Sequence, residues 1–100
     1  NVGIMQNHRN GSTDEQFLLD ARQSRKVKLF GTPTMGVIDV SNMSKVVSPC
    51  GDFVLWYALT KSLRVPEMAV DNVGVQPDYY IDSEIPDYKW VEFVVDVLNE

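Results

Sequence analysis

The stretch that organises this sequence is Asn10-Gly11-Ser12-Thr13-Asp14-Glu15-Gln16-Phe17, a polar turn that leads directly into an amphipathic helix. The apolar residues 2–5 just before it predict a short buried strand. Gly11 supplies the backbone freedom that a sharp turn needs. A strand, a glycine turn, a serine and a helix are the parts of a nucleophile elbow, although the usual Gly-x-Ser-x-Gly signature is absent.

Ser12 therefore has two interpretations. In the first it only caps the helix, because Ser12 and Glu15 have the spacing of a capping box, which Thr13 and Gln16 repeat one residue later. In the second, Thr13 is the cap and Ser12 stands just outside the helix with a free hydroxyl. The amides of the first turn would then lie where hydrogen-bond donors stabilise a developing oxyanion. Spacing alone favours the cap.

The rest of the chain alternates between helix and strand patterns. A helix is predicted over residues 14–24, with Phe17, Leu18 and Ala21 on one apolar face. Residues 26–30 alternate like a strand with one wet face. Two extended segments, 37–47 and 53–65, flank a turn and predict a long hairpin. Because both faces of the first half of the second segment are apolar, we expect both to be covered.

The last quarter predicts a brief strand over residues 79–81 and a final helix capped by Asp87. The apolar positions of that helix follow the spacing of a core-facing stripe: Trp90, Phe93, Val94, Val97 and Leu98. The order of elements predicts a single domain, residues 1–100, of α/β class with a mixed sheet and flanking helices.

Composition argues against several classes of function. A net charge of −5 does not suit binding to nucleic acid or an anionic membrane, which need clustered Lys and Arg. One Cys and one His exclude an intrachain disulfide and make a His/Cys zinc site unfavourable, so we expect no metal and no cofactor. No apolar run is long enough to span a bilayer. The lone His8, four residues before Ser12, is interpreted as a solvated loop residue.

Three blocks, taken in order, resemble motifs of the tail-specific (C-terminal processing) serine peptidases. They are Ser12-Thr13-Asp14-Glu15-Gln16-Phe17, Gly31-Thr32-Pro33-Thr34-Met35-Gly36 and Gly74-Val75-Gln76-Pro77-Asp78. The resemblance spans nearly the whole chain and implies a crotonase/ClpP-like α/β fold. It covers only the C-terminal portion of that family's catalytic domain, so we expect the chain to be a fragment of a longer protein.

The resemblance also implies roles for individual residues. Ser12 falls on the family's nucleophile, and the backbone N–H of Thr13 falls on one oxyanion donor. The glycine loop would contribute binding residues, at Gly31, Thr34 and Gly36.

The general base implied by the resemblance is not the lysine of the Ser–Lys branch. That lysine immediately follows the second glycine of the loop, and here this position is Val37. The chain therefore looks more like the tricorn-like branch, which uses a serine, a histidine and a later acid. Asp71 matches the acid, where the family has Glu, and the histidine falls outside this chain.

These roles imply a peptide or protein substrate for the parent protein and an isolated chain that is inactive. The resemblance alone suggests the cell envelope, the periplasm or secretion as the location. We also expect the chain to self-associate or to pair with a missing N-terminal part, because half a sheet exposes an edge. The alternative is a non-catalytic module that binds a hydrophobic ligand or a partner on the same fold, with the apolar hairpin lining the site.

Overall fold

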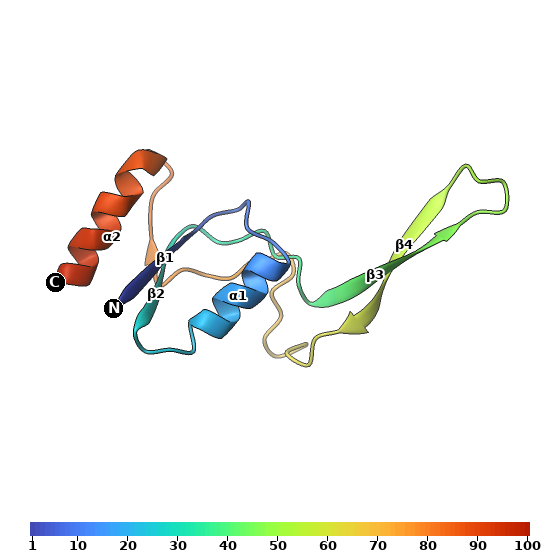
Figure 1. Cartoon of the computed structure of the whole chain (residues 1–100), viewed down its shortest axis with the longest axis horizontal. Helices are drawn as coiled ribbons and strands as arrows, with labels where there is room; N and C mark the ends of the chain where they lie inside the picture. Colours follow the sequence, from blue (N-terminus) through green and yellow to red (C-terminus); the bar gives the residue numbers. More distant parts are fainter.

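Strand β1 (Val2–Gln6), helix α1 (Thr13–Ala21) and strand β2 (Val27–Gly31) form a parallel strand–helix–strand unit in the computed structural model, which describes residues 1–100 (Figure 1). A third strand, β5 (Tyr79–Tyr80), pairs in parallel with the other side of β2. The resulting sheet has the order β1-β2-β5. Because it combines parallel and antiparallel strands with two α-helices, the small domain has α+β character.

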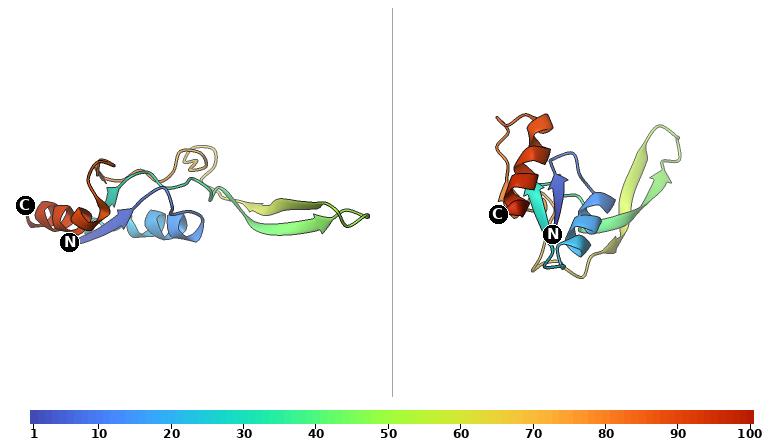
Figure 2. Two further views of the ribbon diagram at one scale, coloured as in Figure 1. Left: turned by 90° about the horizontal axis from the view of Figure 1, so that it is seen from above. Right: turned by 60° about the vertical axis from the view of Figure 1, so that its left-hand side comes forward.

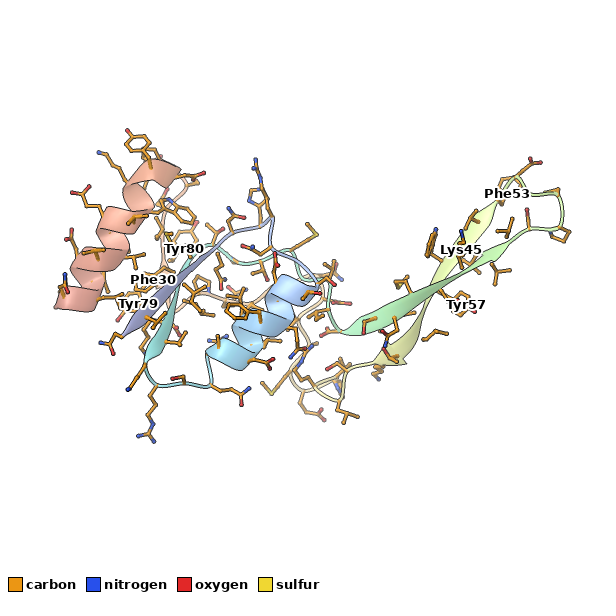
Figure 3. All side chains as sticks on the ribbon, in the orientation of Figure 1. Phe30, Lys45, Phe53, Tyr57, Tyr79 and Tyr80 are labelled. Carbon is orange, nitrogen blue, oxygen red and sulfur yellow. The ribbon has the colours of Figure 1, made fainter.

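The two helices cover opposite faces of this sheet. Leu18 of α1 packs with Leu29 of β2, and Phe30 of β2 packs with Val94 of helix α2 (Trp90–Asn99). Because Leu29 and Phe30 are neighbours in a strand, their side chains point to opposite faces. The Phe30 ring also stacks on Tyr79, with ring centroids 4.8 Å apart (Figure 3). The core is therefore divided into two small clusters by the sheet.

Strands β3 (Val40–Val47) and β4 (Val54–Lys61) form an antiparallel hairpin that projects from the body of the domain (Figures 1 and 2). The register runs from Val47 opposite Val54 to Val40 opposite Lys61. The chain measures 61 × 29 × 17 Å and its radius of gyration is 17.1 Å. A compact chain of this length would have a radius of about 13 Å. The hairpin accounts for this elongation.

Two sequence expectations about the sheets are corrected by this arrangement. The strands do not form one mixed sheet, since the parallel and antiparallel strands lie in two separate sheets. Nor are both faces of β4 covered, because Leu55 is 64% exposed and Trp56 is 58% exposed. An apolar pattern indicates that a strand has faces to bury, but it does not indicate whether another element of the same chain packs on those faces.

The helix ends also differ from the expectation. Helix α1 begins at Thr13 and ends at Ala21, and Phe17 on its predicted apolar face is 60% exposed. Asp87 caps no helix: it lies in a short 3-10 turn, η1 (Asp87–Lys89), that precedes α2 and has no side-chain cap. The apolar stripe of α2 is confirmed as core. Neither helix is long and apolar enough to cross a membrane.

Candidate active site at the start of helix α1

Ser12 occupies the N-cap of α1 in a strained backbone conformation. Its φ is 53° and its ψ is −115°, a region that residues other than glycine rarely adopt. Such strain is found where the surrounding structure holds a residue in a functional geometry. The Ser12 side chain faces the Glu15 amide in a capping-box arrangement, but its hydroxyl makes no cap hydrogen bond. The residue is exposed, so the hydroxyl is open to solvent.

The Thr13 amide is the second feature of this turn. Asp14 N–H donates to Gly11 O at 3.1 Å, whereas Thr13 N–H makes no hydrogen bond within the chain. An unpaired amide at a helix N-terminus attracts negative charge. Thr13 was expected to be the cap if Ser12 were a nucleophile, but the cap is Ser12 itself. The capping role and the nucleophile role of Ser12 are therefore compatible with the same position at the start of α1.

Glu15, on the buried side of α1, fixes the conformation of the Ser12 turn. Its carboxylate is fully buried and accepts four hydrogen bonds. Oε2 accepts from the backbone N–H groups of Ser12 and Val37, both at 2.9 Å. Oε1 accepts from the Thr34 hydroxyl and the Gly36 N–H, both at 2.6 Å. Because bonds to an ionised acceptor are the strong ones, this carboxylate ties the Ser12 turn to the glycine loop.

Thr34 carries the connection on to the third sequence block. Its hydroxyl donates to Glu15 and accepts from Val75 N–H at 2.7 Å. In the same block, Asp78 Oδ2 accepts from Leu29 N–H at 2.8 Å and pins the segment beside β2. The three blocks, far apart in the sequence, therefore meet in one hydrogen-bonded network.

The glycines of these blocks allow the backbones to approach closely. Gly31 has a φ of 124°, and a Cβ there would lie 2.0 Å from Gln6 O. Gly36 and Gly74 both have a φ of 79°, and each would meet backbone atoms within 3 Å. Gly31, Thr34 and Gly36 were predicted as binding residues. All three are buried, and the contacts that the geometry gives them are with the scaffold of the Ser12 turn.

Ser12 and Asp71 line the same hollow, which has a volume of 390 Å³ and includes Val37 and the start of β3. Asp71 Oδ1 accepts from the N–H groups of Ile38 and Asp39, at 2.7 and 2.9 Å. Its Oδ2 makes no hydrogen bond within the chain. The carboxylate is thus oriented by one oxygen and leaves the other available. The structure brings together the two side chains that the sequence assigned to catalysis.

Asp39 also belongs to the site region, although no motif in the sequence singles it out. Its buried Oδ2 accepts from the N–H groups of Val70 and Asp71, both at 2.8 Å, and Oδ1 accepts from Arg64 Nη1 at 3.1 Å. Burial opposes the charged form, but these amide and guanidinium donors outweigh it and hold the pKa of Asp39 below its ordinary value. Its partners are more than twenty residues away, so no local pattern could have identified it.

No basic side chain of this chain lines the Ser12 hollow. His8 is exposed and lines a different hollow, together with Thr32 and Trp90. Val37, at the position of the family's lysine, lines the Ser12 hollow and carries no titratable group. No cluster of three or more His, Cys, Asp or Glu side chains that could hold a metal ion is present.

Neither a protein-family model nor a curated protein matches the chain.

Proposed function

We propose that residues 1–100 carry the nucleophile-bearing part of a serine peptidase centre of the tail-specific type, with the general base supplied from outside this chain. The finer fold assignment, to the C-terminal portion of a crotonase/ClpP-like domain, is part of the same proposal. The proposal rests on the three sequence blocks and on the hydrogen bonds among Glu15, Thr34 and Val75, which connect those blocks to the turn that carries Ser12.

The single observation that carries the proposal is the state of Ser12. The serine is exposed, has a strained backbone and precedes an amide that has no partner. A helix cap alone needs no positive φ, because N-cap residues ordinarily have extended backbone angles. A nucleophile elbow does need a strained turn, because the strain pushes the hydroxyl out toward the substrate.

The chemistry follows from these positions. Ser12 Oγ attacks a peptide carbonyl carbon and its proton passes to the external base, which we take to be a histidine as in the tricorn-like branch. The carbonyl oxygen becomes an oxyanion and accepts a hydrogen bond from Thr13 N–H. The free Oδ2 of Asp71 orients the base and stabilises its cation. The base then protonates the leaving amine, and water releases the acyl group from Ser12.

The test is a peptidase assay of the natural protein, including any sequence outside residues 1–100. Ser12→Ala should lower kcat by at least about a thousandfold, because the covalent step is lost. Ser24→Ala, an exposed serine beyond the other end of α1, is the matched control and should leave kcat unchanged. Full activity in the Ser12→Ala protein would overturn the proposal. The isolated 100-residue chain should show no turnover, because it holds no base beside Ser12.

A non-catalytic binding module is the second candidate. It is favoured by the apolar side chains of Val37, Val40 and Met43 in the same hollow. The two candidates separate in one experiment on the natural protein. Retention of a hydrophobic ligand, without reaction of Ser12 with a serine-directed phosphonate, would support the binding module and contradict the peptidase.

A further inference from the structure

Asp39 and Asp71 bind each other by hydrogen bonds in both directions. The Asp39 N–H donates to Asp71 Oδ1 at 2.9 Å, and the Asp71 N–H donates to Asp39 Oδ2 at 2.8 Å. We call these two residues the aspartate pair. Ile38 and Val70, the residues just before them, each donate one further N–H to the same two oxygens, at 2.7 and 2.8 Å. Both the backbone and the side chain of Asp71 are therefore anchored at Asp39.

Only one member of the aspartate pair faces the Ser12 hollow. Asp71 lines the hollow, and its Oδ2 makes no hydrogen bond within the chain. Asp39 is 5% exposed and does not line the hollow. Any effect of the Asp39 side chain on chemistry at Ser12 must therefore pass through Asp71.

Arg64 orients the Asp39 carboxylate. Its Nη1 donates to Asp39 Oδ1 at 3.1 Å and to the Met68 carbonyl oxygen at 3.2 Å. The Arg64 side chain is 19% exposed, so little water competes for this contact. Because the guanidinium binds Oδ1, Oδ2 faces the N–H groups of Val70 and Asp71. Arg64 therefore fixes the direction in which the Asp39 carboxylate points.

These contacts join the base of the hairpin to the segment that carries Asp71. Asp39 lies just before β3, and its carbonyl oxygen accepts from the Ser62 N–H, just after β4, at 2.7 Å. Arg64 follows two residues later. The two ends of the hairpin thus meet at the residue that anchors Asp71, so the position of Asp71 depends on the hairpin base.

We propose that Asp39 and Arg64 are positioning residues of the Ser12 site. Arg64 orients the Asp39 carboxylate, Asp39 anchors Asp71, and the unbonded oxygen of Asp71 is thereby held toward the external base. This inference rests on the peptidase function proposed above and extends it to two residues that do not line the hollow.

Peptidase assays of the natural protein with Arg64→Leu test the positioning role. Loss of the guanidinium should lower kcat by about tenfold to a hundredfold with little change in KM, because a small displacement of Asp71 weakens its action on the base. Arg64→Lys, which keeps the charge and a donor nitrogen, should recover most of that loss.

Two control variants separate positioning from a loss of charge or stability. Arg25→Leu removes an exposed arginine after α1 and should leave kcat unchanged. Val94→Ala truncates the core on the α2 face of the sheet, so it should destabilise the fold and still leave kcat unchanged. Every variant is assayed at a temperature at which circular dichroism shows it fully folded.

A double-mutant cycle tests whether Arg64 acts through Asp71. In an Asp71→Asn background, Arg64→Leu should lower kcat by less than about threefold, because the carboxylate that Arg64 helps to position is already absent. Reductions that multiply in the double variant would overturn the proposal.

The direction of the pH shift provides a second readout. If Arg64 acted only through its charge, Arg64→Leu would raise the pKa of a cationic base and shift the pH–rate profile to higher pH. If Arg64 positions Asp71, the same substitution weakens the Asp71 contact with the base, lowers the pKa of the base and shifts the profile to lower pH. We expect the shift to lower pH, and a shift to higher pH would contradict the positioning role.

The same set of assays distinguishes failure of this inference from failure of the peptidase function. If Ser12→Ala and Asp71→Asn lower kcat but Arg64→Leu matches the unsubstituted protein, the positioning role is wrong and the peptidase function stands. If Ser12→Ala keeps full activity, the peptidase function is wrong and the positioning role is rejected with it.

Discussion

The Glu15 carboxylate and the Thr34 hydroxyl are joined by a hydrogen bond of 2.6 Å, and through it the start of α1 is connected to the glycine loop. Neither residue touches solvent to any significant extent. Together they explain why the Ser12 turn, the glycine loop and the Gly74–Asp78 block belong to one unit. They hold the Ser12 backbone, whose φ of 53° would otherwise relax.

The first prediction concerns Glu15→Gln. The glutamine NH2 group would replace one carboxylate oxygen and would point its N–H groups at a backbone N–H donor. Both this donor and the NH2 group would then be buried without an acceptor. We expect the free energy of unfolding to fall by about 2–4 kcal/mol in urea titration. Glu92→Gln, at an exposed position in α2, is the control and should change it by less than about 0.5 kcal/mol. A stability loss no larger than that of the control would show that the network does not support the fold.

The second prediction separates backbone strain from close approach. Gly51 and Gly74 have nearly equal φ values, 81° and 79°, but a Cβ on Gly51 meets nothing within 4 Å and one on Gly74 lies 2.2 Å from Thr34 O. Gly51→Ala should therefore cost only the strain, about 1–2 kcal/mol. Gly74→Ala should cost about 1–3 kcal/mol more, because the loop must move. Equal losses in thermal unfolding would contradict the close packing of the third block.

The extent to which the sequence predicts this structure depends on the range of each interaction. Strand β1, the hairpin pairing and the core stripe of α2 were predicted because apolar periodicity is a local signal, and the structure confirms these elements. The expected burial of β1 is wrong, because Val2 is 52% exposed and Met5 is 46% exposed. Ser12 and Asp71 were selected by resemblance, and they do line one hollow.

The remaining features depend on distant partners. Glu15 has the spacing of an ordinary capping-box residue. No neighbouring residue indicates that its carboxylate accepts hydrogen bonds from the glycine loop, about twenty residues further along the chain. Asp39 and Arg64 meet across a similar distance. The cover of β4 was predicted wrongly for a related reason, since a strand pattern shows a need for burial and not the identity of the partner.

The third prediction concerns pH. The pKa of Asp39 is lowered from 3.8 in the folded chain, so the ionised carboxylate stabilises the fold. This contribution is fully present above the unfolded-state pKa and is lost as the pH falls through the lower folded-state pKa. Asp39→Asn should therefore be less stable than the unsubstituted chain at pH 7, and the difference should shrink below about pH 4. A difference in urea midpoint that is independent of pH would contradict this assignment.

The fourth prediction tests Asp71 as a positioning residue in the natural protein. Asp71→Asn keeps an oxygen that can accept from Ile38 and Asp39 but removes the charge that would stabilise a cationic base. We expect kcat to fall by about a hundredfold or more, with little change in KM, because the charge acts on the transition state. The pH–rate profile should shift to lower pH, because the base loses the anion that stabilises its protonated form. Asp78→Asn, whose carboxylate contacts β2 and not the Ser12 hollow, is the comparison variant. A rise in KM alone would assign Asp71 to substrate binding.

The central claim, that Ser12 is a nucleophile, is tested most directly by reaction of the natural protein with a serine-directed phosphonate, followed by mass spectrometry of its peptides. The account predicts one covalent adduct, located on Ser12, which is absent from Ser12→Ala and unchanged in Ser24→Ala. An adduct on another residue, or a protein that hydrolyses peptides while Ser12 remains unmodified, would contradict it.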